Sequence, residues 1–174
     1  NPVFADIDPD THNIDPNSIE ERITDKTKAI IPVAHDGLPY DIDRVMEIAN
    51  KHDLIVLKDN AQAINAEYNG RYVGKDAHIT MFSFERTKHV STGEGGMLIT
   101  NDSELAIKSR KFAGMGFKNL SSKKSDLVAG VPLEYQNPTY ERNDELGLNY
   151  RFNEFLAAIA LAQFEIVDKR VKLR

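Results

Sequence analysis

Three continuous apolar runs, separated by segments of helical periodicity, restrict this chain to a narrow set of folds. The runs occupy residues 28–34, 54–59 and 79–84. Uninterrupted apolar runs of this length are typical of strands that are buried on both faces of a sheet. Between the first two runs, Asp41 precedes apolar residues spaced one helical turn apart, which predicts a capped helix. This alternation predicts an α/β fold with a mostly parallel sheet flanked by helices.

Shorter patterns predict further elements around this sheet. They are a strand at 3–7, a helix that begins after Asp15-Pro16, an Asn-Gly hairpin within 68–74, a strand at 96–100 and a helix over 102–112. Asn153 is expected to cap a long helix with a buried stripe at Phe155, Leu156, Ile159, Ala160, Gln163, Ile166 and Val167. Residues 114–146 are polar and lack a clear period, and a loop of that length is usually functional or mobile.

Composition excludes several classes of protein. The 174 residues carry a net charge of −5, so no basic field favours nucleic acid or an anionic membrane. The absence of cysteine excludes disulfides, thiolate zinc sites and cysteine nucleophiles. No apolar run approaches the roughly 20 residues of a membrane helix, and the N-terminus lacks the pattern of a signal peptide. We expect a cytoplasmic protein with no membrane or nucleic-acid partner, and both ends of the sequence look cut from a longer chain.

Two ionisable residues follow buried strands closely. Asp59 ends one apolar run, and Lys88 comes a few residues after another. Ligands of open α/β sheets gather beyond the carboxyl ends of the strands, so an acid and an amine from neighbouring strands could face one crevice. Position alone leaves open a simple salt bridge, or two solvated side chains, as the alternative.

Competing motifs fail on spacing. Residues 70–75 (GRYVGK) are one residue short of a phosphate loop, and Asp76 stands where a Ser or Thr should bind magnesium. The glycines at 93–96 precede a strand, whereas a dinucleotide fingerprint follows one, so a nicotinamide-binding domain has little support. The five histidines lack metal-binding spacing, and no metal site is expected. The remaining chemistry for Lys88 is imine formation with a carbonyl group. Pyridoxal phosphate enzymes use a lysine in this way, and they also need an acid beside the pyridine nitrogen.

Three blocks of sequence carry a resemblance to a known family. They are LKDNAQAINAEYNGRYVG (57–74), FSFERTKHVSTGEGGMLITND (82–102) and LGLNYRFNEFLAAIALAQ (146–163). In this order and spacing they resemble the DegT/DnrJ/EryC1/StrS sugar aminotransferases, a family of fold-type-I pyridoxal phosphate enzymes. The similarity also covers 3–33 and leaves out the 114–146 loop.

The resemblance implies the architecture of the aspartate aminotransferase-like large domain. Residues 1–174 would form the central part of that cofactor-binding domain, with an N-terminal segment and a C-terminal small domain missing. The implied reaction moves an amino group, with glutamate as the expected donor, to a keto-sugar that is nucleotide-linked, in polysaccharide biosynthesis. The implied assembly is a homodimer with shared active sites.

The same resemblance implies roles for five residues at the cofactor. Lys88 looks like the catalytic lysine that holds pyridoxal 5′-phosphate as a Schiff base and moves the proton. Asp59 looks like the partner of the pyridine nitrogen, and Gln62 is similar to the glutamine near the ring hydroxyl. Ser83 looks like a phosphate ligand. Asn149 resembles the asparagine that reaches the phosphate in the neighbouring subunit.

Further positions concern the substrate or depart from the family pattern. Arg151 is similar to a residue that supports the crossing contact or the donor carboxylate, and His35 lies in a segment that is often near the sugar in the family. His35-Asp36 replaces a frequent aromatic pair, Lys58 replaces a usual glutamate, and Asn60 replaces a small residue. The glycines at 93, 95 and 96 would let the backbone pass close to the lysine.

Two alternatives remain beside the aminotransferase. One is a non-catalytic or regulatory relative that keeps the fold. The residues around Asp59 that differ from the family pattern are compatible with this alternative. The other is a sugar dehydratase of the same family, a branch in which histidine replaces the catalytic lysine. This chain keeps Lys88, with His89 beside it.

Overall fold

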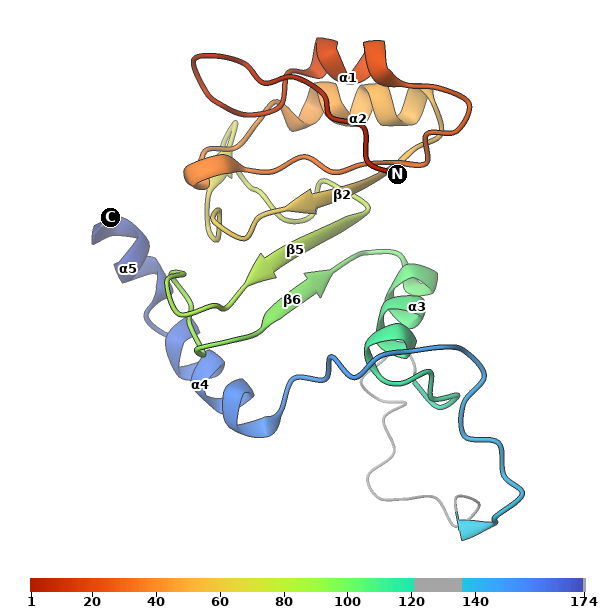
Figure 1. The fold of residues 1–174 in the computed structure, drawn as a ribbon. Coiled ribbons are helices and arrows are strands. Elements are labelled where there is room, and N and C mark those ends of the chain that lie inside the picture. Colours follow the sequence, from red (N-terminus) through yellow and green to blue (C-terminus); the bar gives the residue numbers. More distant parts are fainter. Residues whose placement is uncertain (121–135, 174) are drawn as a thin grey trace. The chain divides into compact units, whose positions relative to one another are not determined.

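The computed structural model describes residues 1–120 and 136–173 of the chain (Figure 1). Those residues form two compact units. The first contains Asn1–Ile99 together with the C-terminal segment that begins at Glu154, and the second spans Thr100–Asn153. The predicted sheet and the Asp59 and Lys88 segments all belong to the first unit.

The first unit is built on a four-stranded sheet in the order β1-β2-β5-β6. β1 pairs with β2 and β2 with β5 in parallel, whereas β6 runs antiparallel to β5. The strands are β1 (Ala29–Ile30), β2 (Ile55–Asp59), β5 (Ile79–Ser83) and β6 (Gly96–Ile99). The Asn-Gly turn forms the predicted hairpin from β3 (Glu67–Tyr68) and β4 (Arg71–Tyr72). The prediction of a mostly parallel sheet is therefore confirmed.

Two helices lie together on one side of β2, α1 (Pro16–Arg22) and α2 (Ile42–Lys51) (Figure 1). Both begin as predicted, because the side chains of Asp15 and Asp41 accept hydrogen bonds from the amides of Asn17 and Arg44. The apolar stripe of α2 enters a core whose members come from the helices, the strands and their connections. This core comprises Ile19, Ile30, Ala34, Tyr40, Ile42, Val45, Ile48, Ala49, Leu54, Val56, Ala63 and Val73.

Shortening Ile48 should destabilise the first unit strongly. Its side chain is fully buried in this core, so Ile48→Ala leaves a cavity and is expected to lower the free energy of unfolding by about 3 kcal/mol. Denaturant unfolding of the full-length protein would measure the loss. Glu47→Ala, on the exposed side of the same helix, is the matched control and should change that free energy by less than about 0.5 kcal/mol. Equal effects of the two substitutions would contradict this packing.

The opposite face of the sheet is open within the first unit. Ile31 is 59% exposed, and Val33 and Ile55 on the same face are also exposed. The prediction of strands buried on both faces is therefore wrong for the described residues, because both helices that pack on the sheet lie on its other side. The strand expected at 3–7 is wrong too, since only an isolated bridge joins Ile7 to Ile14.

The predicted long C-terminal helix is two helices, α4 (Glu154–Phe164) and α5 (Val167–Leu173). Of the expected buried stripe, Phe155, Ile159 and Ile166 are exposed, whereas Ala160 and Val167 are buried. The stripe prediction fails because α4 is apolar on nearly all sides, so its periodicity does not select one face. The Phe164 ring makes an edge contact with the Phe84 ring, at 5.8 Å between centroids.

The second unit contains α3 (Ser103–Ala113), which forms where a helix was predicted and is capped by Asp102, whose side chain accepts from the amides of Glu104 and Leu105. Lys111 Nζ lies 2.6 Å from the carboxylate of Asp144, which joins α3 to the later part of the unit. Of the predicted 114–146 loop, residues 121–135 lie outside the described part of the chain. No helix among the described residues has the length and apolar character that crossing a membrane requires.

Candidate functional site

Three segments that follow strands leave the sheet at one edge. A parallel bridge joins Val33 to Asp59, and Asp59 is in register with Met81 of β5. The chain therefore emerges beside Asp59 both after β1 and after β5. This is the carboxyl edge of the parallel strands, where α/β sheets gather ligands. Asp59, Gln62, Ser83, Lys88 and His35 all lie on these three segments.

Asp59 is fixed at the end of β2 through its backbone and its side chain. Its amide donates to Pro32 O at 2.9 Å, and its carbonyl oxygen accepts from the Ala34 amide at 3.0 Å. The carboxylate Oδ1 accepts from the Ala61 amide at 2.9 Å. Oδ2 makes no hydrogen bond within the described part of the chain, and the half-buried side chain can offer it to a ligand.

Gln62 is held against the turn that carries His35. Its Oε1 accepts from the Asp36 amide at 2.7 Å. The turn is the short 3-10 helix η1 (His35–Gly37), in which Asp36 has a left-handed φ of 52°. On the other side, the buried Asn13 accepts from the His35 amide at 2.9 Å and donates to Leu38 O at 2.9 Å. His35 is therefore exposed on a turn that hydrogen bonds to Gln62 and Asn13 hold in place, and it lies beside Gln62.

The close approach of this turn to Gln62 requires a glycine at position 37. Its φ is 84°, and a Cβ there would meet Gln62 O at 2.9 Å. Gly37→Ala therefore combines backbone strain with displacement of Gln62. Gly70 has a similar φ of 72° and open space around a Cβ, so Gly70→Ala is the matched control. We expect the control to cost about 1 kcal/mol of unfolding free energy, and Gly37→Ala about 1–2 kcal/mol more. Equal losses in denaturant titrations would contradict the close approach to Gln62.

Ser83 and Lys88 are joined by a turn built around Glu85. The Glu85 amide donates to Ser83 Oγ at 3.2 Å, and the Lys88 amide donates to Glu85 O at 3.0 Å. The Glu85 carboxylate accepts from the Thr87 amide at 2.9 Å. Hydrogen bonds from the Thr87 hydroxyl and amide hold the pKa of Glu85 below its ordinary value, with smaller contributions from the charges of Arg86 and Lys88. An ionised carboxylate therefore shapes the turn that carries the half-buried Lys88.

The loop that contains Lys88 is tied down at several points. The Phe84 amide donates to Gly95 O at 2.8 Å, and the Phe84 carbonyl accepts from Thr92. Phe84 and Val90 are buried, and Arg170 of α5 donates to His89 O at 3.1 Å. Of the glycines expected to approach the lysine, Gly96 makes its close approach elsewhere, since a Cβ there would meet Phe82 O of β5 at 2.7 Å.

Asn149 and Arg151 belong to the second unit. Asn149 forms an antiparallel bridge with Gly114 at the end of α3, and Arg151 Nε donates to Asn149 Oδ1 at 3.1 Å. Both side chains are exposed and held beside each other by this bond. The structure therefore joins these two predicted residues as a pair within the second unit.

Sequence reasoning missed one polar cluster behind this edge. Lys58 is completely buried, with Nζ 2.9 Å from Asp76 Oδ1 and 5.4 Å from the centroid of the Tyr40 ring. Burial lowers the pKa of Lys58, and the hydrogen bond and charge of Asp76 oppose this. Burial, with the Asp76 and Asp59 charges, raises the pKa of Tyr40. A lysine inside the apolar run at 54–59 was the available signal, but it did not identify Asp76 as the partner.

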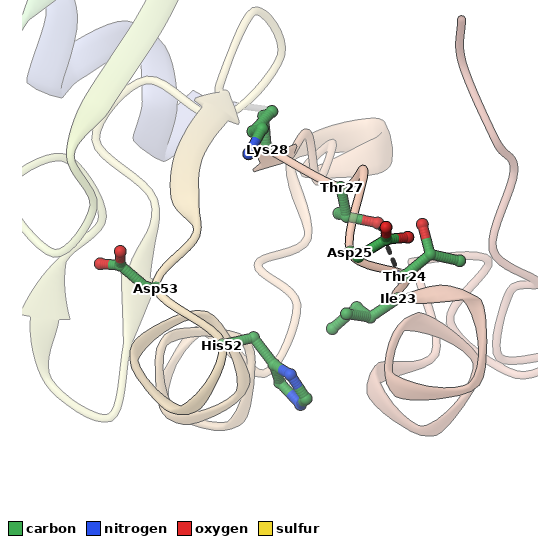
Figure 2. A pocket seen from close by; sticks show the side chains of 7 residues that line it. All are labelled: Ile23, Thr24, Asp25, Thr27, Lys28, His52 and Asp53. Atoms are coloured by element: carbon green, nitrogen blue, oxygen red, sulfur yellow. Dashed lines mark hydrogen bonds between the residues drawn. The ribbon is translucent and has the colours of Figure 1, made fainter.

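A surface pocket lies at the other edge of the sheet. Figure 2 shows it between the residues that precede β1 and those that precede β2; its lining comprises Ile23, Thr24, Asp25, Thr27, Lys28, His52 and Asp53. It contains none of the predicted site residues. The described residues also include no group of three or more His, Cys, Asp or Glu side chains placed to hold a metal ion.

Comparison with known proteins identifies the family of the chain. A model of the DegT/DnrJ/EryC1/StrS aminotransferase family matches residues 1–174. The pleiotropic regulatory protein of Geobacillus stearothermophilus is 41% identical over 99% of this chain and 41% of its own length. The GDP-perosamine synthase of Caulobacter vibrioides is 39% identical over 99% of this chain and 42% of its own length. The chain thus spans about two fifths of the length of these relatives.

Solved structures show the same fold. An aminotransferase from Psychrobacter cryohalolentis matches with a TM-score of 0.83 and 37% identity, over 97% of this chain and 41% of that one. The GDP-4-keto-6-deoxy-D-mannose-3-dehydratase of E. coli, solved with bound hydrated PLP, matches with a TM-score of 0.78 and 30% identity. That match covers 95% of this chain and 42% of the dehydratase chain. These similarities confirm the fold class predicted from the sequence.

Proposed function

Because the chain belongs to the DegT/DnrJ/EryC1/StrS aminotransferase family, we propose that the full-length protein is a pyridoxal phosphate-dependent sugar aminotransferase. One observation supports this above the others. Strands β2 and β5 are parallel neighbours, so Asp59 and the Ser83–Lys88 turn leave the sheet at the same edge. An acid, a hydroxyl and a half-buried amine are the groups that a phosphorylated pyridine aldehyde requires.

The residues present fit this cofactor in their chemistry. Asp59 offers an oxygen, Oδ2, with no hydrogen bond in the described part of the chain, and this oxygen would accept from the pyridine nitrogen. The Ser83 hydroxyl oxygen accepts from the Glu85 amide, so its proton is available for a phosphate oxygen. Gln62 would lie near the ring hydroxyl. The cofactor, when bound, supplies an electron sink for the substrate carbon.

Each side chain then has a distinct task in amino transfer. The Lys88 amine would hold the cofactor, release it to the amino donor, and move a proton between the substrate carbon and the cofactor. The Asp59 carboxylate would keep the pyridine nitrogen protonated. Asn149, supported by Arg151, would reach the phosphate in the neighbouring subunit, which makes the active enzyme a homodimer.

For the substrates, we propose glutamate as donor and a nucleotide-linked keto-sugar as acceptor. The similarity to a GDP-perosamine synthase supports an acceptor of this class. His35, on the braced turn beside Gln62, would contact the sugar, and Arg151 is a second candidate for the donor carboxylate. Residues 1–174 would be part of the cofactor-binding large domain of a cytoplasmic enzyme, with an N-terminal segment and a small C-terminal domain in the full-length protein.

Two other functions have specific support. A regulatory relative is favoured by the similarity to a protein named for pleiotropic regulation. A sugar dehydratase is favoured by the match to the E. coli 3-dehydratase. Lys88 favours amine transfer over dehydration, since a lysine amine can both hold the cofactor and relay the proton.

Cofactor titration of the full-length protein tests the proposal. Pyridoxal phosphate is expected to give a visible absorption band that L-glutamate, but not D-glutamate, converts, with release of 2-oxoglutarate. A screen of nucleotide-linked keto-sugars would then identify the acceptor by restoration of that band. Absence of the absorption band would indicate a regulatory relative. Loss of a hydroxyl group from the keto-sugar would indicate a dehydratase.

A further inference from the structure

The buried polar cluster behind Asp59 is not explained by stability alone. Lys58 is wholly buried, and taking its charge out of water is costly even when it is paired with Asp76. Three buried oxygens, Tyr40 Oη, Asn60 Oδ1 and Thr80 Oγ1, make no hydrogen bond with other described residues. Unpaired buried oxygens cost further free energy. Such a cluster suggests a role beyond packing.

Both neighbours of Asp59 in the chain bind the same distant segment. Lys58 Nζ bonds to Asp76 Oδ1 at 2.9 Å, and the buried Asn60 Nδ2 donates to Val73 O at 2.7 Å. The segment 73–76 follows the β3–β4 hairpin. Thus the backbone on either side of Asp59 is anchored to one short stretch of chain on one face of the sheet.

Asp59 itself points to the other face. Successive side chains of a strand alternate between the two faces, so the Asp59 carboxylate projects away from the side on which Lys58 meets Asp76. With both flanking residues anchored, rotation of the backbone at Asp59 is restricted. The carboxylate is then held in the orientation in which Oδ1 accepts from the Ala61 amide and Oδ2 is available.

We propose that Lys58 and Asn60 are positioning residues that hold the Asp59 carboxylate in its cofactor-binding orientation by anchoring β2 to Val73 and Asp76. The proposal rests on the function assigned above, because it takes Asp59 as the partner of pyridoxal phosphate. The orientation of Asp59 can nevertheless be measured without the cofactor. The Ala61 amide proton reports it directly, since this amide donates to the Asp59 side chain.

Amide hydrogen exchange of the cofactor-free full-length protein tests the positioning. Lys58→Met and Asp76→Asn each remove the ion pair, and Asn60→Ala removes the bond to Val73. Each is expected to speed exchange of the amides at position 60 and at Ala61 by about tenfold, a change within the range of interaction free energies between contacting residues. Pyridoxal phosphate affinity, followed by absorption, should fall by a similar factor. Asp76→Glu, which keeps the carboxylate at a partly exposed position, should restore most of both properties.

Arg71→Met is the matched control. Arg71 belongs to the β3–β4 hairpin that precedes Asp76, and it forms an exposed ion pair with Asp43 at 2.7 Å. Its loss should leave exchange at Asn60 and Ala61 and cofactor affinity within about twofold of the wild type, as expected for a surface pair.

The outcomes separate the two proposals. If Lys58→Met, Asp76→Asn and Asn60→Ala behave like Arg71→Met, the positioning role is overturned. Should Lys58→Met fail to fold, Asp76→Asn and Asn60→Ala carry the same test. A wild-type protein that binds no pyridoxal phosphate would overturn the proposed function, while the exchange rates would still decide whether Lys58 and Asn60 hold Asp59.

Discussion

In the full-length protein, Lys88→Ala is expected to lower the turnover number for amino transfer by about 10³- to 10⁴-fold, since it removes both covalent attachment and the proton relay. The visible absorption that depends on the lysine amine should disappear as well. The melting temperature should hardly change, because the side chain is only half-buried and the turn is shaped by the Lys88 amide and by Glu85. Steady-state kinetics, absorption spectra and thermal unfolding measure these three quantities.

The control for this substitution is Lys75→Ala. Lys75 is an exposed lysine beyond the β3–β4 hairpin, and no role at the cofactor is proposed for it. Kinetics and spectrum should remain those of the wild type. If Lys88→Ala retained the visible band, or lost less than about tenfold in turnover, another amine would hold the cofactor and the assignment of Lys88 would be wrong.

The second large effect is expected for Asp59→Asn. Asparagine can keep the hydrogen bond from the Ala61 amide to the side-chain oxygen, so the local geometry should persist. It carries no charge, however, and would no longer keep the pyridine nitrogen protonated. We expect kcat/KM to fall by about 10²-fold or more, in the range seen when one charge-stabilising group is removed from an active site. Kinetics and the pH dependence of the cofactor absorption would measure the change.

Asp53→Asn is the control for charge removal near β2. Asp53 lies before that strand, in the pocket at the other edge of the sheet (Figure 2). Its substitution should leave kcat/KM unchanged. An Asp59→Asn enzyme with wild-type kcat/KM would show that the pyridine nitrogen has a different partner.

The local elements were predictable because their signals lie within the chain segments themselves. Asp15 and Asp41 cap the helices that their positions predict, and the Asn-Gly turn makes its hairpin. The apolar run at 54–59 becomes the central strand β2. The register of that strand against β5 then brings the Asp59 and Ser83 segments to one edge. Local pattern and known strand topology were therefore sufficient for this part of the candidate site.

Burial and partner choice were not predictable in the same way. Ile31 and Phe155 have strongly apolar neighbours in the sequence but are exposed, because burial depends on which other segment covers a face. Likewise, the pairing of Lys58 with Asp76 depends on how the chain returns after the hairpin. A lysine in an apolar run indicates that a charged side chain will be buried and will need a partner. The identity of that partner is a property of the tertiary structure.

The reversal of β6 has a consequence for engineering. Because β6 is antiparallel to β5, Ser83 pairs with Gly96, and the loop 84–95 begins and ends at neighbouring positions of one ladder. Outside the sheet, the Phe84 ring contacts Phe164 of α4, and His89 O accepts from Arg170 of α5. A loop that keeps these contacts could therefore be exchanged without moving any strand. A transplanted loop that keeps the buried Phe84 and Val90 should be accepted by the sheet. Grafting the corresponding loop of a relative with different chemistry would replace Lys88, the proposed reacting residue, while Asp59 keeps its place at the end of β2.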